Sequence, residues 1–282
     1  MKPITQLLLL FCVSVAFISC TQESQTDDAT EEAVVEELPP QVKGEEISYS
    51  ADDVNMNGYI SYDVHKAEKR PGVLVVHEWW GHNEYARKRA DMLAELGYVA
   101  LAVDMYGDGK TADHPEDAGK FATAVFQNLE GGAARFQKAY EMLQAHPQVD
   151  GENIAAIGYC FGGTVVINMA NMGMDLKGVA GFHAGLSLPI PPETDKVKAK
   201  ILVCNGADDP MISTEQVEAF KTAMTDAGVD YTYISYPETV HSFTNPAATE
   251  LGEKFEMPAA YNEEADKASW EELQKFFTKI FS

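Results

Sequence analysis

The segment 158–163, Gly-Tyr-Cys-Phe-Gly-Gly, constrains the fold more than any other part of the sequence. It follows the apolar run 154–157 and precedes a helix-like stretch over 164–172, so it marks a sharp turn from a strand into a helix. Glycine two residues to either side of Cys160 removes side chains that would collide with neighbouring backbone in such a turn. The spacing is that of a nucleophile elbow with cysteine at its centre.

Short apolar runs alternate with amphipathic stretches from residue 46 onward. The pattern predicts a hairpin over 46–64 and strands at 73–77, 98–103, 154–157, 178–182, 201–204 and 231–236. It predicts helices that begin at Asn83, at residue 164 and at Ser213, where Gln216 completes a capping box. Residues 115–146 are predicted to form two helical pieces joined near Gly131-Gly132. The final predicted helix has Trp270, Leu273, Phe277 and Ile280 on one face. Strands that alternate with helices indicate an α/β fold with a mostly parallel central sheet and helices on both faces. Active sites in such sheets lie beyond the carboxyl ends of the strands.

The first 45 residues have a composition unlike the rest. Residues 1–19 contain a basic start and an apolar run that ends at Ser19, which predicts a secretory signal peptide. Cys20 follows directly, and the arrangement resembles a bacterial lipoprotein signal in which this cysteine receives the lipid. An ordinary signal peptide with an incidental cysteine is the alternative. Residues 20–45 are acidic and predict a flexible linker, so we expect an exported domain held in the bacterial cell envelope, on its periplasmic or surface side.

Charge and cysteine content exclude several classes of protein. The chain of 282 residues has 44 acidic and 21 basic side chains, a formal net charge of −23, which argues against binding to nucleic acid or to an anionic bilayer by charge. Four cysteines are too few for a disulfide scaffold. The domain predicted over 46–282 has no apolar run long enough to span a membrane. Membrane contact is therefore expected through the lipid anchor only.

A cysteine nucleophile requires a base and a group that orients the base. His241 follows the run 231–236, and the order nucleophile, acid, histidine is the one expected along such a chain. Asp208 and Asp209 both follow the run 201–204. We favour Asp209 as the acid because the next residue is proline, which biases its backbone to an extended form.

The segment 77–81, His-Glu-Trp-Trp-Gly, follows the first buried strand and so belongs to the same sheet edge. A buried carboxylate is costly without a partner, and the thiol of Cys160 is a possible partner for Glu78. The spacing from His77 to His82 is not that of a zinc-binding helix, so we expect no metal and no cofactor. His77 and His183 lie at strand ends and could line the site, Asp104 is expected to be structural or part of the pocket, and the histidines expected at the surface are His65, His82, His114 and His146.

Four pieces together resemble the dienelactone hydrolase family, a branch of the α/β-hydrolases. They are Glu78 with Gly81 and Asn83, the elbow around Cys160, Gly-x-x-Asp ending at Asp209, and His-Ser-Phe from His241, in family order over 46–282. The resemblance implies an α/β-hydrolase fold and a triad of Cys160, His241 and Asp209. It implies an oxyanion hole from the amides of Trp79 and Phe161, and a Glu78 that pairs with the resting nucleophile and helps to activate it. The implied reaction is hydrolysis of an ester or lactone through a thioester.

One position departs from the family pattern. Dienelactone-specific members bind the substrate carboxylate with arginines, one of them shortly after the catalytic histidine, where this chain has Asn245. The fold and catalytic groups therefore carry over, whereas the dienelactone substrate does not. We expect a small ester or lactone in a compact pocket that includes Trp80, His183 and Asn245, and a monomeric protein. A thioesterase or peptidase with the same triad, which for acyl chains needs a long apolar cleft, and a non-catalytic binding protein on this scaffold are the alternatives.

Overall fold

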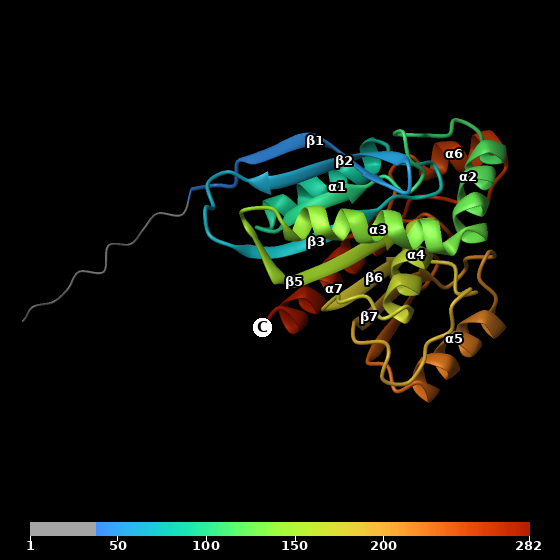
Figure 1. Ribbon diagram of the computed structural model, residues 1–282. Helices are drawn as coiled ribbons and strands as arrows, with labels where there is room; N and C mark the ends of the chain where they lie inside the picture. The colour runs from blue at the N-terminus through green and yellow to red at the C-terminus, as the bar shows by residue number, and fades with distance from the viewer. Residues whose placement is uncertain (1–37) are drawn as a thin grey trace, which may run out of the picture. The chain divides into compact units, whose positions relative to one another are not determined.

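The computed structural model describes residues 38–282, which form one mixed sheet of eight strands between two layers of helices (Figure 1). The strand order is β1-β2-β4-β3-β5-β6-β7-β8. The six strands from β4 to β8 along this order are parallel, and the hairpin β1–β2 adds to β4 in the antiparallel sense. This arrangement confirms the predicted α/β-hydrolase fold.

The strands are β1 (Val42–Ala51), β2 (Val54–Asp63), β3 (Arg70–Val76), β4 (Val99–Val103), β5 (Val149–Tyr159), β6 (Gly178–Phe182), β7 (Lys200–Gly206) and β8 (Tyr231–Tyr236). The helices are α1 (Glu84–Glu95), α2 (Pro115–Gln127), α3 (Leu129–Gln144), α4 (Phe161–Asn171), α5 (Thr214–Asp226), α6 (Ala248–Phe255) and α7 (Glu263–Ile280). The chain passes from β3 to β4 on one side and returns to β5 on the other. The order of the parallel strands therefore reverses at β3, and this is where a ligand site is expected in an open α/β sheet.

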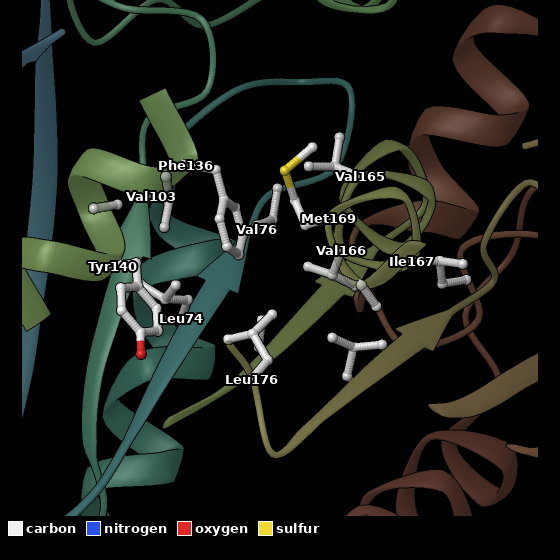
Figure 2. Packing of buried hydrophobic residues seen from close by; sticks show 14 of the residues in the cluster. Leu74, Val76, Val103, Phe136, Tyr140, Val165, Val166, Ile167, Met169 and Leu176 are labelled. Carbon is white, nitrogen blue, oxygen red and sulfur yellow. The ribbon is translucent and has the colours of Figure 1, made fainter. Parts of the chain in front are cut away.

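The sheet separates two apolar cores. Along β3, Leu74 and Val76 pack with α3 and α4 on one face, as Figure 2 shows, whereas Val73 and Val75 pack with α1 and α7 on the other. All four side chains are fully buried, which explains why the strand is continuously apolar in sequence. The two cores fix the strand ends, and through them the loops that follow.

The amino-terminal hairpin is longer than the sequence indicated. We expected a flexible linker up to residue 45 and a domain from residue 46, but β1 begins at Val42. The backbone amide of Gln41 also donates a 2.9 Å hydrogen bond to the carboxylate of Asp63, at the far end of β2. Ladder hydrogen bonds with β2 order this acidic stretch although little of it is buried. The predicted signal peptide, Cys20 and most of the predicted linker lie outside the described residues.

Two helical features differ from the sequence prediction. The two pieces over 115–146 meet at Asn128 rather than at Gly131-Gly132, because the Asn128 side chain accepts a 3.0 Å hydrogen bond from the amide of Gly131 and so caps α3. Helix α6 was not predicted, and it follows directly on the loop that carries His241. Within residues 38–282, no helix is both long and apolar enough to cross a membrane.

Candidate active site

Cys160 lies at the sharp turn between β5 and α4, in a backbone conformation that side-chain-bearing residues rarely adopt. Its φ is 53° and its ψ is −114°. A Cβ atom at Gly158 would lie 2.1 Å from the carbonyl oxygen of Gly162, and one at Gly162 would lie 2.3 Å from that of Val76. The glycines therefore permit the close backbone contacts that raise Cys160 at the carboxyl edge of the sheet. The thiol is partly accessible, whereas the other cysteine of the described chain, Cys204, is fully buried in β7.

His241 and Asp209 come together from the loops after β8 and β7. The Nδ1 atom of His241 is 2.8 Å from Oδ2 of Asp209, and both side chains are buried. The other carboxylate oxygen of Asp209 accepts a hydrogen bond of 2.9 Å from the amide of Met211, which fixes the carboxylate in its own loop. Asp208, the alternative acid, is exposed. The geometry thus brings His241 to Asp209 and not to Asp208.

The second ring nitrogen of His241, Nε2, is not bonded to any other part of the described domain. Nε2 is buried and has no hydrogen-bond partner within residues 38–282, and His241 lines the same cavity as Cys160. Burial opposes a positive charge on this ring. The negative charge of Cys160 and the hydrogen bond with Asp209 outweigh burial and raise the pKa of His241 to about 10.

Glu78 follows β3 and is almost completely buried. Its Oε1 accepts a hydrogen bond of 2.9 Å from the hydroxyl of Ser242, and its Oε2 accepts one of 2.6 Å from the side-chain amide of Asn245. The carboxylate is therefore held by the histidine loop, and not by the thiol of Cys160 that the sequence suggested as its partner. Burial raises the pKa of Glu78, and the two hydrogen bonds partly offset the effect.

Two backbone amides near Cys160 are available for a ligand. Phe161 is the first residue of α4, where backbone amides have no acceptor within the helix. The amide of Trp79 makes no hydrogen bond among the described residues, and the carbonyl of the same residue accepts a hydrogen bond of 2.9 Å from the Tyr106 hydroxyl. That hydrogen bond restrains the Trp79 loop. These are the two amides that the resemblance implied for an oxyanion hole.

A compact apolar cavity opens beside Cys160 and His241. Its volume is about 170 Å³, and its walls include Trp79 and Trp80 on one side and α6 with the segment after it on the other. Its lining residues are Trp79, Trp80, Cys160, Met211, His241, Ser242, Asn245, Ala248, Leu251, Met257, Pro258 and Ala259. No lysine or arginine is among them. A cavity of about 150 Å³ can hold a benzene ring, so this one suits a small ring or a short acyl chain.

The predicted pocket residues fall into two groups. Trp80 and Asn245 line the cavity, but His183 does not: it is fully buried behind His241, with ring centroids 5.3 Å apart. Its Nε2 is 2.8 Å from the hydroxyl oxygen of Thr244. His183 thus supports the histidine loop from behind, because the loop after β6 turns under the loop after β8.

Two other residues considered from the sequence, His77 and Asp104, do not line the cavity. His77 is fully buried and accepts a hydrogen bond from the amide of Met105 at 3.3 Å. Asp104 is also fully buried, and its carboxylate accepts four backbone hydrogen bonds, from the amides of Asn57, Tyr106, Gly107 and Gly109. Both are structural parts of the sheet edge.

His82 was expected at the surface and is instead 3% exposed. Neither ring nitrogen has a hydrogen-bond partner among the described residues. A polar residue in a loop indicated exposure, but the loop packs down on the sheet edge. Within residues 38–282 no three acidic, histidine or cysteine side chains are grouped to hold a metal ion.

Two polar residues of the site were not singled out from the sequence. Ser242 binds Glu78, and its place directly after His241 was the available signal. Arg89 in α1 is buried and contacts the histidine loop. Its signal was its position on the same helix face as Ala86, Ala90 and Leu93, where an apolar side chain is expected.

Comparison with known proteins identifies the family. The family model described as the dienelactone hydrolase family matches residues 56–281. Protein usf of Aquifex pyrophilus is 27% identical over 223 residues, which are 78% of this chain and 95% of that protein. The crystal structure of a dienelactone hydrolase-like promiscuous phosphotriesterase from metagenomic libraries is 32% identical, with a TM-score of 0.78 over 85% of this chain and 98% of that one. A structure named m3DLH is 35% identical, with a TM-score of 0.79 over 86% and 99% of the two chains. The chain therefore belongs to the dienelactone hydrolase family.

Proposed function

We propose that this protein is a cysteine-dependent hydrolase of small, uncharged esters or lactones that acts through a thioester. The observation that carries the proposal is the convergence of three loops: Cys160 and His241 line one cavity, and His241 is bonded to Asp209 at 2.8 Å. Nucleophile, base and orienting acid are the parts that acyl transfer needs. A binding protein needs none of them together.

The first half of the reaction forms the thioester. The sulfur of Cys160 attacks the substrate carbonyl carbon after its proton has passed to Nε2 of His241. The amides of Trp79 and Phe161 donate hydrogen bonds to the oxyanion that develops. The imidazolium then protonates the departing alcohol oxygen as the carbon–oxygen bond breaks. Asp209 stabilises the charged ring and keeps Nε2 directed at the cavity.

The second half releases the acid. Nε2 of His241 takes a proton from water, whose oxygen attacks the thioester carbonyl in the same oxyanion hole. The carbon–sulfur bond breaks, the sulfur recovers its proton from His241, and the carboxylic acid leaves. The raised pKa of His241 favours the imidazolium that forms in each half of the reaction.

The cavity supports small and uncharged substrates. A long acyl chain needs an extended cleft, whereas this cavity measures about 170 Å³ and has residues of α6 and Trp80 in its wall. The carboxylate of Glu78 lies beneath it, and Asn245 stands where an arginine binds a substrate carboxylate in dienelactone-specific members of the family. An anionic substrate would meet the buried carboxyl group of Glu78 and no lysine or arginine in the cavity wall.

The test is hydrolysis of p-nitrophenyl acetate and butyrate by the full chain and by Cys160→Ala. We expect activity in the first, none above background in the second, and identical circular dichroism spectra. A covalent acyl adduct of the expected mass on Cys160, trapped at low pH, marks the thioester. Full activity of the alanine variant would refute the proposal, and an inactive wild-type protein with an alkylatable Cys160 would favour the binding-protein alternative.

A second activity, hydrolysis of phosphotriesters, has one specific observation in its favour. A phosphotriester is uncharged and suits a cavity that has no lysine or arginine in its wall, and a structural relative of 32% identity is named as a promiscuous phosphotriesterase. We propose that Cys160 can attack such a phosphorus centre with loss of the aryloxide. Release of p-nitrophenol from diethyl p-nitrophenyl phosphate by the wild type and not by Cys160→Ala is the expected result. No release by the wild type excludes this activity.

The amino-terminal sequence supports placing the hydrolase in the cell envelope, with Cys20 as its lipid attachment site. Incorporation of a labelled fatty acid into the wild type, and its absence in Cys20→Ala, is the expected result. Labelling that survives the substitution would exclude Cys20.

A further inference from the structure

The loop from His241 to Asn245 carries three side chains of the site in a strained backbone. His241 faces Cys160, and Ser242 and Asn245 hold Glu78. Ser242 has a φ of 56°, in the left-handed region that residues with side chains avoid. Such a conformation persists only where the surroundings impose it. The surroundings of this loop therefore decide where the imidazole of His241 stands.

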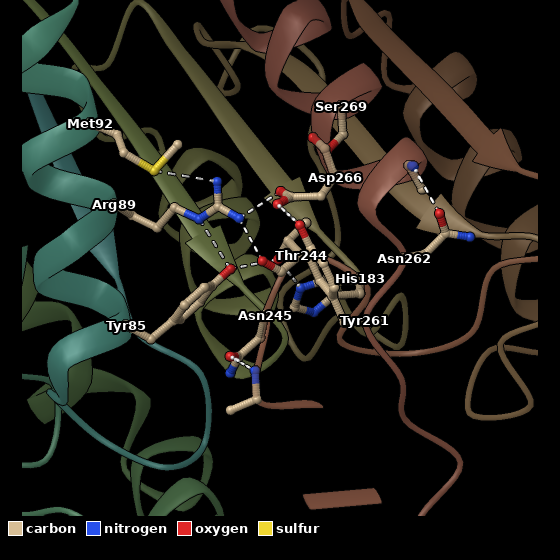
Figure 3. A network of polar contacts seen from close by, with 12 residues as sticks. Tyr85, Arg89, Met92, His183, Thr244, Asn245, Tyr261, Asn262, Asp266 and Ser269 are labelled. Atoms are coloured by element: carbon tan, nitrogen blue, oxygen red, sulfur yellow. Dashed lines mark hydrogen bonds and ion pairs between the residues drawn. The ribbon is translucent and has the colours of Figure 1, made fainter. Parts of the chain in front are cut away.

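Arg89 supplies one of these restraints. Its guanidinium reaches from α1 to the loop, where Nη2 donates a hydrogen bond of 2.6 Å to the carbonyl oxygen of Thr244, and the same nitrogen is 2.6 Å from the carboxylate of Asp266 in α7 (Figure 3). The side chain of Arg89 is 4% exposed. The rings of Tyr85, Tyr159 and Trp270 enclose the guanidinium carbon at 5.2–5.4 Å.

A second branch fixes the side chain of the same residue. The hydroxyl oxygen of Thr244 is 2.5 Å from that of Tyr85 and 2.8 Å from Nε2 of His183. Nε of Arg89 donates to the Tyr85 hydroxyl at 3.3 Å, and the ring of His183 packs against that of His241. Figure 3 shows the two branches meeting at Thr244. Both the backbone and the side chain of Thr244 are thus held, directly or through Tyr85, by one guanidinium.

We propose that Arg89 is a positioning residue for His241. It is not among the residues that line the cavity and so does not touch substrate. It sets the backbone of the histidine loop through Thr244 and so fixes the loop to α1. Lysine cannot replace it, because an ammonium group lacks the planar fork that serves Thr244, Tyr85 and Asp266 at once. The inference rests on the proposed hydrolase function for its kinetic test, but it also has a test that needs no ester.

The design separates positioning from stability. Arg89→Met removes the bond to Thr244 and leaves Asp266 unpaired. Asp266→Asn breaks the same ion pair and so also lowers the melting temperature, yet it keeps the bond from Arg89 to Thr244. Arg89→Lys retains the charge and serves if the methionine variant does not fold. Arg87→Met, on the same helix, removes a surface ion pair with Glu46 and is the neutral control.

Two readouts are measured below the melting temperature of every variant. For Arg89→Met, or for Arg89→Lys if methionine prevents folding, we expect kcat for p-nitrophenyl acetate to fall by about 10²-fold with KM within about twofold, because a small misplacement of a catalytic group is sufficient for such a loss. Alkylation of Cys160 by iodoacetamide at pH 7, followed by peptide mapping, should slow by about tenfold, since the thiol loses its partner base. Asp266→Asn and Arg87→Met should match the wild type in both readouts.

The outcomes are distinct. For each variant, the losses in kcat and in alkylation rate are compared with the loss in melting temperature. If these losses stand in the same proportion in Asp266→Asn as in the Arg89 variant, Arg89 is only structural and the proposal fails. If the Arg89 variant keeps the wild-type rates, the proposal also fails. A wild-type protein without esterase activity refutes the proposed function, and the alkylation series then still decides the role of Arg89.

Discussion

Asn245 donates a hydrogen bond of 2.6 Å to Glu78, and Ser242 donates a second, so both hydrogen-bond donors to this buried carboxylate are neutral. This pairing joins the loop after β3 to the loop after β8. No lysine or arginine lines the cavity beside it.

The first prediction concerns substrate charge. Methyl 4-acetoxybenzoate and 4-acetoxybenzoate differ by one negative charge at the same distance from the ester. We expect kcat/KM to be at least about tenfold higher for the methyl ester, since an unpaired charge is costly in this cavity. In Asn245→Arg the ratio of the two kcat/KM values should be smaller, because the guanidinium offsets the negative charge of Glu78. Equal rates for the two esters in the wild type would contradict the prediction.

The second prediction separates two adjacent acids. Asp209→Asn should lower kcat by about 10²–10⁴-fold, because the amide no longer stabilises the imidazolium of His241. Asp208→Asn, whose side chain is exposed, should stay within about twofold of the wild type and is the matched control. Steady-state kinetics at pH 7.5 decides between them. A larger loss of kcat for the Asp208 variant would show that Asp208, and not Asp209, is the acid.

The third prediction concerns the elbow. Gly158→Ala would place a Cβ atom 2.1 Å from the Gly162 carbonyl oxygen, so it should destabilise the domain by about 3 kcal/mol or more. Gly119→Ala lies in α2 with no atom within 4 Å of the new Cβ, and should stabilise the helix by up to about 1 kcal/mol. Urea unfolding measures both changes. Similar free energies of unfolding for the two variants would show that the elbow tolerates a side chain.

The fourth prediction is acid destabilisation by buried histidines. Burial lowers the pKa of His77 to about 4 and that of His82 to about 3, both below the ordinary value of 6.5. Below pH 6.5 the unfolded chain therefore binds protons that the folded chain does not, and stability falls as the pH drops towards 4. We expect each of these two histidines to lower the free energy of unfolding by about 2 kcal/mol between neutral pH and pH 5.

His82→Leu tests this directly. Because neither ring nitrogen of His82 has a partner among the described residues, the variant should be at least as stable as the wild type at pH 7.5. Between pH 7.5 and 5.0 it should lose about 2 kcal/mol less than the wild type. His65→Leu, at an exposed position, should lose as much as the wild type. An equal loss in all three proteins would mean that His82 is accessible to protons in the folded state.

The sequence was sufficient for the parts of the site that local pattern determines. Apolar runs located the strands, and the residues that directly follow them, Glu78, Cys160, Asp209 and His241, had to meet at one sheet edge. The elbow was readable because Gly158 is required by a backbone contact close in sequence, with the carbonyl oxygen of Gly162. These inferences need only the rule that parallel strands end on the same side.

The parts that failed depend on contacts between segments distant in sequence. Nothing near Glu78 indicated that Ser242 and Asn245 would bind it, because 164 and 167 positions separate these partners. His82 looked like a loop residue until the loop packed on the sheet. No role was predicted for Arg89, whose partner Thr244 lies 155 positions away in the sequence.

The direction of β1 has a practical consequence. β1 runs parallel to β3 and β4, so Val42 lies at the edge of the sheet opposite Cys160, and the described domain begins on the side away from its cavity. Enzyme immobilised on a bead or electrode by this end would expose the entrance to the bulk solution. A coupling through the loops after β3 or β8 would instead block the approach of substrate.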